Sequence, residues 1–220
     1  MKAIRTEDVT IGDVLSEAGY VTGYWGKWGY GGSKSQPDPE ILNVQTLPTS
    51  HGYEHVLAEL HHVRAHTFFQ PTLWKAPAAP GALGGLELVP NSMERYKNSR
   101  FYSNAPALQN HKNYPDTAYC DDAYAFAALD FVRIQSQNYN ATGQPFFGLL
   151  ALQIPHSPFS EVTQLPEWEV AYEKLPFWNS LSDQSKQWAS MISRIDGHIG
   201  NILTALEDPN GDGDTSDSVV

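Results

Sequence analysis

Residues 145–152 read Pro-Phe-Phe-Gly-Leu-Leu-Ala-Leu, an unbroken apolar run of strand length that decides the class of fold. Such a run is typical of a strand buried on both faces of a parallel sheet, because a strand with one solvated face alternates apolar and polar residues. The run ends at Ile154-Pro155-His156-Ser157-Pro158, where two prolines withhold backbone donors and stop regular pairing. His156 therefore follows a predicted strand.

Helical patterns lie on both sides of this strand. Apolar residues within 117–137 fall on one helical face, and those within 188–206 follow a period of 3.6 residues. An acidic turn at 208–217 leads to the valines at 219–220, which we expect to begin another strand.

The N-terminal part shows the same alternation. Thr10 and Asp13 fit the capping box of a short helix that ends at Gly19. Residues 20–25 are rich in aromatic and β-favouring side chains and run into a glycine-rich loop. Lys27 therefore lies at the C-terminal end of a predicted strand.

The alternation of helices and strands predicts an α/β fold, a mainly parallel sheet flanked by helices. Segment 33–115 is irregular and punctuated by prolines and glycines, and we interpret it as an excursion from the sheet. Ligands of parallel sheets bind beyond the C-terminal ends of the strands. Because Lys27 and His156 each follow a strand, we expect both at one rim of the sheet.

Composition excludes several classes of protein. The 220 residues are 41% hydrophobic and 18% charged, which indicates a packed globular chain. Twenty-five acidic against 14 basic residues give a net charge of −11, too negative for a broad nucleic-acid surface but compatible with a small local anion site. The single cysteine, Cys120, excludes an internal disulfide, and no apolar run approaches the roughly 20 residues of a membrane span.

Residues 19–29, 145–158 and 191–206 carry three spaced motifs that together resemble those of the sulfatase family. Residues 19–29, with Gly-Tyr followed by Gly-Lys-Trp-Gly, resemble its helix end, strand and Gly-Lys-Trp loop. Residues 145–158 are similar to its later strand and Pro-His-x-Pro loop, and residues 191–206 resemble the helix before its second metal-binding loop. The resemblance implies an alkaline-phosphatase-like, arylsulfatase-like domain, with residues 1–220 forming a partial catalytic domain that is incomplete at both ends.

The resemblance also implies hydrolysis of sulfate esters and assigns roles to basic residues. The leaving oxygen of a sulfate ester gains negative charge, so the site needs cations and a proton donor. By resemblance, Lys27 contacts the sulfate, and His156 hydrogen-bonds it or assists the leaving group. One family pattern places a histidine where this chain has Gly29, whereas other members resemble this chain in having Gly-Lys-Trp-Gly and a later His-Ala-His stretch, which residues 64–66 partly match. His66 is a candidate for that missing imidazole, and Arg64 is a candidate sulfate contact.

Other parts of such a site are absent from the sequence. Sulfatases use a formylglycine made within Cys/Ser-x-Pro-x-Arg, and Cys120 has neither the proline nor the arginine. They also use a divalent cation, usually calcium, whose expected ligands are missing here. We therefore expect the 220-residue chain alone to be inactive. The resemblance further implies a sulfated small molecule or glycan as substrate and a periplasmic or extracellular location, and it leaves the oligomeric state open.

Two alternative functions remain. A phosphatase or phosphodiesterase of the same superfamily would use a Ser or Thr nucleophile, and a non-catalytic module would bind an anion or glycan without turnover. The histidine-rich stretch 51–66 lacks a matched metal-ligand spacing and is typical of surface residues. Asp121 and Asp122 resemble a carboxylate pair, but adjacent helical positions point in different directions, which favours a solvated helix face.

Overall fold

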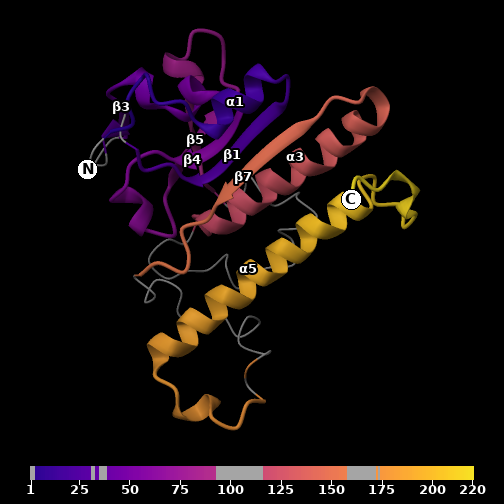
Figure 1. The fold of residues 1–220 in the computed structure, drawn as a ribbon. Coiled ribbons are helices and arrows are strands. Elements are labelled where there is room, and N and C mark those ends of the chain that lie inside the picture. The colour runs from indigo at the N-terminus through magenta and orange to yellow at the C-terminus, as the bar shows by residue number, and fades with distance from the viewer. Residues whose placement is uncertain (1–2, 31–32, 35–38, 93–115, 158–171, 173) are drawn as a thin grey trace.

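A five-stranded sheet of order β6-β5-β4-β1-β7 forms the centre of the computed structural model, which describes residues 3–30, 33–34, 39–92, 116–157, 172 and 174–220 (Figure 1). The strands are β1 (Val21–Lys27), β4 (His55–Glu59), β5 (Thr72–Ala76), β6 (Glu87–Pro90) and β7 (Phe146–Ala151). β1 pairs in parallel with both β4 and β7, whereas β5 is antiparallel to β4 and β6. Four of these five strands thus run in one direction, and the expected mainly parallel α/β architecture is confirmed.

The α-helices of the described residues are α1 (Ile11–Glu17), α3 (Cys120–Thr142) and α5 (Asp183–Glu207). The capping box at Thr10 and Asp13 is confirmed, and the two long helices lie where the sequence predicts them. Short 3-10 helices are η1 (Val44–Thr46), η2 (Pro48–His51), η3 (Arg64–His66), η4 (Leu83–Gly85), η8 (Trp178–Ser180) and η9 (Thr215–Asp217).

An apolar layer packs against each face of the sheet. α3 covers one face, where Trp25 and Leu57 pack against Tyr124 and Phe131 of the helix. Loops after β3 cover the other face, where residues such as Tyr24 and Trp28 are buried. α5 runs along the outer side of α3 and contacts it through a small cluster that includes Leu129, Val132 and Ala205 (Figure 1).

The prediction that segment 33–115 leaves the sheet is wrong. β4, β5 and β6 all lie within it and supply three of the five strands. Each is only four or five residues long and is bounded by turns, so none builds a recognisable alternating pattern. The same segment also forms a two-stranded hairpin of β2 (Ser33–Lys34) and β3 (Glu40–Ile41), while residues 35–38 and 93–115 lie outside the described residues.

Two further expectations about burial and pairing also need correction. β7 is an edge strand of the described sheet, and Leu149, on the face away from α3, is 37% exposed, so the run is not buried on both faces. Val219 and Val220 do not begin a strand; the Val219 N–H instead donates to the Leu206 carbonyl at 3.0 Å and folds the chain back on the end of α5. Among the described helices, none combines the length and apolarity needed to cross a bilayer.

Candidate active site

Three neighbouring parallel strands, β4, β1 and β7, end at one rim of the sheet and lead into basic side chains. Lys27 is the last residue of β1 and lies in register with Glu59, the last residue of β4. β4 continues into His62 and η3, and β7 continues into the turn that carries His156. The topology therefore gathers residues from three distant parts of the sequence at the edge where parallel sheets bind ligands.

Four basic residues, Lys27, His62, His66 and His156, form what we call the basic cluster. The rings of His66 and His156 are stacked, with centroids 4.5 Å apart and planes 14° apart. The ring of His62 meets that of His66 edge to face at 4.9 Å. A Cβ placed on Gly29 would lie 3.4 Å from Lys27 Cε and 3.8 Å from His62 Nδ1, so these two side chains flank the glycine.

The electrostatics of the basic cluster favour an anion. Burial, followed by the charges of Lys27 and His156, lowers the pKa of both His62 and His66, and partial burial lowers the pKa of Lys27. An anion among these groups would reverse the charge repulsion and stabilise their protonated forms. Among the described atoms, His66 Nε2 is buried without a hydrogen-bond partner. The arrangement thus leaves one ring nitrogen of the basic cluster without a partner among the described residues.

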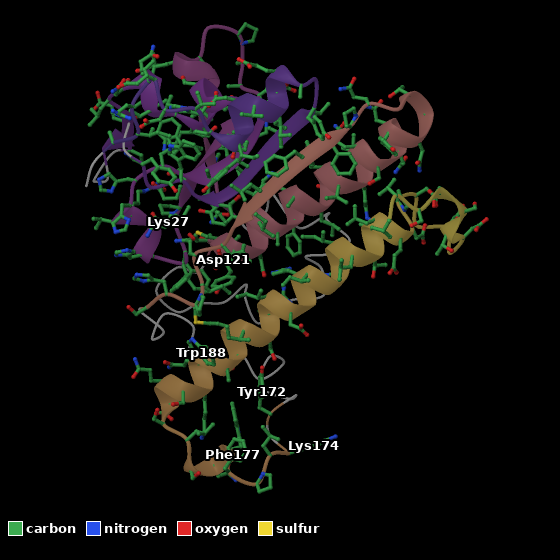
Figure 2. The ribbon with its side chains drawn as sticks, in the orientation of Figure 1. Lys27, Asp121, Tyr172, Lys174, Phe177 and Trp188 are labelled. Carbon is green, nitrogen blue, oxygen red and sulfur yellow. The ribbon has the colours of Figure 1, made fainter. Side chains whose placement is uncertain are left out.

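The structure brings together three of the predicted site residues, Lys27, His66 and His156, and adds His62. Nothing in the spacing of the histidine-rich stretch distinguishes His62 from its neighbours. The sequence feature that could have indicated His62 is Gly29, because a residue without a side chain leaves room for an imidazole from the segment after a neighbouring strand. Figure 2 shows Lys27 at the end of β1.

Arg64, the predicted sulfate contact, is instead engaged inside the protein. Its residue is 3% exposed, and its guanidinium donates to the Glu59 carboxylate and to the carbonyl and hydroxyl oxygens of Thr72, at 2.9 and 2.7 Å. Burial raises the pKa of Glu59 to about 7, and the charge of Arg64 opposes that rise. Glu59 also accepts the backbone N–H of His61 at 2.9 Å. This ion pair, which sequence reasoning missed, shapes the loop that carries His62 and His66.

The expectation that Asp121 and Asp122 lie on a solvated helix face is wrong, because both residues have 0% exposure. Asp121, in the first turn of α3 (Figure 2), accepts the backbone N–H groups of Gln153 and Ile154 at 2.8 and 3.2 Å. Burial raises its pKa to about 7. The two carboxylates do point in different directions, but both directions lead into the protein.

Asp122 serves a separate purpose, the joining of α3 to α5. Its carboxylate accepts from Arg194 Nε and Nη2 at 2.9 and 3.0 Å and lies 2.6 Å from His198 Nε2. Burial would raise the pKa of Asp122, but the hydrogen bond from His198 and the charge of Arg194 lower it. The partners of both aspartates are distant in sequence, which is why their burial could not be predicted.

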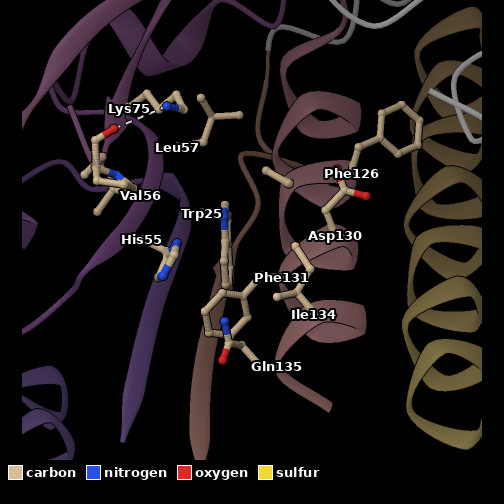
Figure 3. A pocket seen from close by; sticks show the side chains of 13 residues that line it. Trp25, His55, Val56, Leu57, Lys75, Phe126, Asp130, Phe131, Ile134 and Gln135 are labelled. Atoms are coloured by element: carbon tan, nitrogen blue, oxygen red, sulfur yellow. Dashed lines mark hydrogen bonds between the residues drawn. The ribbon is translucent and has the colours of Figure 1, made fainter. Parts of the chain in front are cut away.

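The histidines His51 and His55 lie apart from the basic cluster. His51 is buried, with its Nδ1 atom 3.5 Å from Asp13. His55, at the start of β4, lines a cavity of about 390 Å³ with Trp25, Lys75 and other residues (Figure 3). His55 and Glu59 are the first and last residues of β4, four steps apart, which corresponds to about 13 Å along a strand. The cavity is therefore distinct from the basic cluster.

The described residues do not fit a metal site. Within them, no group of three or more His, Cys, Asp or Glu side chains is arranged to hold a cation. The histidine-rich stretch accordingly supplies neighbouring rings but no metal-ligand set among the described residues.

Comparison with known proteins identifies a family to which the sequence of this chain is similar. A family model described as Sulfatase matches residues 2–216. The N-acetylglucosamine-6-sulfatase of Homo sapiens is 32% identical over 118 residues, which cover 50% of this chain and 20% of that protein. The enzyme of the same name from Capra hircus is 30% identical over 118 residues and is covered to 19%. The matched region thus spans about a fifth of the length of these curated relatives.

Solved structures resemble the chain over nearly its whole length. The crystal structure of Ps i-CgsB has a TM-score of 0.57 and 22% identity, covering 95% of this chain and 38% of that one. The putative sulfatase yidJ from Bacteroides fragilis has a TM-score of 0.59 and 15% identity, covering 94% of this chain and 42% of that one. At these identities the similarity supports the fold.

Proposed function

The chain belongs to the sulfatase family, and we propose that the full-length protein hydrolyses sulfate esters, with Lys27, His62, His66 and His156 on the sulfate-binding side of its active site. The observation that carries this proposal is the basic cluster itself. A chain with a net charge of −11 places a lysine and three histidines at one rim, with two imidazole rings stacked 4.5 Å apart. Such a concentration of donors suits a small, strongly charged anion.

Lys27 is the permanent charge of the proposed site. Its ammonium group would face the sulfuryl oxygens, where negative charge is present in the substrate and is redistributed as the ester S–O bond breaks. Fixed donors aimed at such charge are among the largest contributions to catalysis. Lys27 is held at the end of a paired strand, so its backbone is fixed before substrate arrives.

His156 is suited to protonate the leaving oxygen. Its Nδ1 lies 2.5 Å from the Ser157 carbonyl oxygen, which can only accept, so Nδ1 carries a proton. Nε2 is then the nitrogen available to the substrate. Donation from Nε2 to a leaving alkoxide requires the doubly protonated ring, and the negative charge of a sulfate bound beside the ring would favour that form. Because the His66 ring stacks on His156, charging both at once is unfavourable, and His66 acts as a neutral hydrogen-bonding partner.

The substrate we propose is a sulfated sugar. Support comes from the relatives named N-acetylglucosamine-6-sulfatase, which match half of this chain. An exported enzyme, periplasmic or extracellular, is consistent with a glycan substrate. We assign a formylglycine nucleophile and a calcium ion to residues other than those described, because the sequence lacks the nucleophile motif and the described residues contain no ligand set.

The proposal is tested by measuring sulfate release from 6-O-sulfated N-acetylglucosamine oligosaccharides with the full-length protein, in parallel with a matched phosphate monoester. Lys27→Met should lower kcat/KM for the sulfate ester by about 10²–10³-fold, the loss typical of one transition-state donor. Lys75→Met is the control, because Lys75 lines the distant cavity and pairs with Glu87 at 3.6 Å; its kcat/KM should stay within about twofold of wild type. Preferential phosphate release would favour a phosphatase, and binding without turnover a glycan-binding module; either result overturns the proposal.

A further inference from the structure

We propose that Asp121 is a positioning residue that fixes the turn carrying His156 against the loop carrying His66, and thereby sets the stacked geometry of the two imidazoles. The inference rests on the proposed function for its catalytic consequence. Asp121 touches neither ring, so its effect on the site passes through the backbone of the turn.

Both oxygens of the Asp121 carboxylate hold this turn. Oδ1 accepts from the Gln153 N–H at 2.8 Å, and Oδ2 accepts from the Ile154 N–H at 3.2 Å. The turn then closes on itself, because the His156 N–H donates to the Gln153 carbonyl at 3.2 Å. His156 therefore lies only three residues after Gln153, whose backbone N–H is bound by the Asp121 carboxylate, so this bond restricts the orientation of His156.

The same turn is joined to the loop of His66. The Gln153 side-chain amide donates to the carbonyl of Ala65, the residue before His66, and reaches the carbonyl of Thr67, the residue after it, at 3.4 Å. Gln153 is thus held through its backbone by α3 and holds the His66 loop through its side chain. A continuous set of hydrogen bonds thus runs from Asp121 to the backbone segments that carry the two stacked rings.

The choice of a carboxylate at this position has a chemical reason. Two converging N–H groups need two acceptor oxygens, whereas an asparagine would supply one acceptor and turn its NH₂ group toward the second N–H. Within the described residues the Asp121 carboxylate pairs with no cation, although it has 0% exposure. Burying an acid without a cationic partner is costly. That cost is consistent with a residue retained for the geometry it imposes.

The neighbouring Asp122 provides a matched control. It is equally buried and sits on the same helix turn, but its partners are Arg194 and His198 of α5. Changing either aspartate to asparagine removes one carboxylate from the first turn of α3. Only the change at Asp121 removes an acceptor from the turn of His156.

The experiment compares Asp121→Asn and Asp122→Asn in the full-length protein by NMR of the histidine rings and by kinetics. Asp121→Asn should shift the ring resonances of His156 and His66 and lower kcat by about 10²-fold, as expected when a reacting group is displaced by about 1 Å. Asp122→Asn should lower the melting temperature while leaving those ring signals in place. Unchanged His156 signals in Asp121→Asn, or equal shifts in both variants, would overturn the proposal.

A second variant covers the case in which Asp121→Asn does not fold. Gln153→Leu keeps the backbone bonds to Asp121 but removes the bridge to the His66 loop, so the stacked rings should separate with the same loss of kcat. Unperturbed His66 and His156 signals in this variant would also refute the idea. The ring signals are measured without substrate, so they test the positioning role independently of the proposed function. If the shifts appear but the protein hydrolyses no sulfate ester, the proposed function fails and the positioning role stands.

Discussion

Replacing Arg64 with methionine tests whether this residue acts inside the protein or on the substrate. The variant leaves the Glu59 carboxylate, at 0% exposure, without its cationic partner, and deprives Thr72 of two hydrogen bonds. Breaking a buried ion pair from one side typically costs about 3–5 kcal/mol, because the remaining charge stays buried. We therefore expect Arg64→Met to lower the free energy of unfolding by about that amount.

The double variant Glu59→Gln/Arg64→Met removes both charges and should recover most of the stability. Neutral replacement of a whole buried pair is often close to neutral, so we expect a loss of about 1 kcal/mol and strong non-additivity. If Arg64 instead contacted sulfate, the single variant would be stable but inactive, and the second change would restore nothing.

The loss of unfolding free energy in Arg64→Met should also depend on pH. Burial raises the pKa of Glu59 to about 7 even with Arg64 present, and without the guanidinium it rises further. The folded protein then binds a proton that the unfolded chain releases above about pH 4.5, so stability is present at low pH and is lost as pH rises through the folded pKa.

Urea unfolding of the full-length protein at pH 5, 6, 7 and 8, followed by tryptophan fluorescence, measures this dependence. Because Glu59 of the wild type already has a pKa raised to about 7, the stability deficit of Arg64→Met relative to wild type should grow chiefly above about pH 7. Between pH 5 and 7 the wild type should lose stability relative to the double variant, which lacks this carboxylate. A deficit independent of pH, or a double variant as unstable as the single one, would refute the assignment of Arg64 to an internal ion pair.

Two other substitutions test the rim and the sheet. His62→Ala should lower kcat/KM by about 10²-fold with little change in melting temperature, because it removes one imidazole from the basic cluster; His55→Ala, at the other end of β4, is its control, and equal losses would remove His62 from the site. Gly26→Ala should lower the melting temperature by about 10 °C or more, because its φ is +120° and the added Cβ would lie 1.9 Å from the Ala151 carbonyl oxygen. Gly19→Ala, with φ +84° but open space around its Cβ, should lose clearly less, and equal melting shifts would contradict the close β1–β7 contact.

The parts of the fold that the sequence predicts are those specified by local pattern. The capping box at Thr10 and the apolar period of α5 depend on residues within a few turns of one another, and both are confirmed. The shared rim of Lys27 and His156 could be inferred because parallel strands impose it once each residue is placed after a strand. The comparisons support the family and the fold, and the roles of these two residues stay proposals.

The parts that could not be predicted depend on distant contacts. β4, β5 and β6 are too short to show a period and owe their burial to α3 and to the covering loops. Asp121 is drawn inward by amides more than thirty positions away, at Gln153 and Ile154. Arg64 was within reach of prediction, since Glu59 precedes it by five residues, but only the burial of both side chains shows that they form a pair.

The order of strands in the sheet has a consequence for the newly made chain. β1 lies between β4, which follows it closely, and β7, whose first residue comes about 120 residues after Lys27. At about 5–20 residues per second on the ribosome, one edge of β1 waits about 6–24 s for its partner. An unpaired strand edge beside Trp25 is a template for pairing with another chain, so the growing chain is exposed to such pairing during this interval. His156, the last of the four basic residues to be synthesised, directly follows β7, the strand that pairs with this edge of β1.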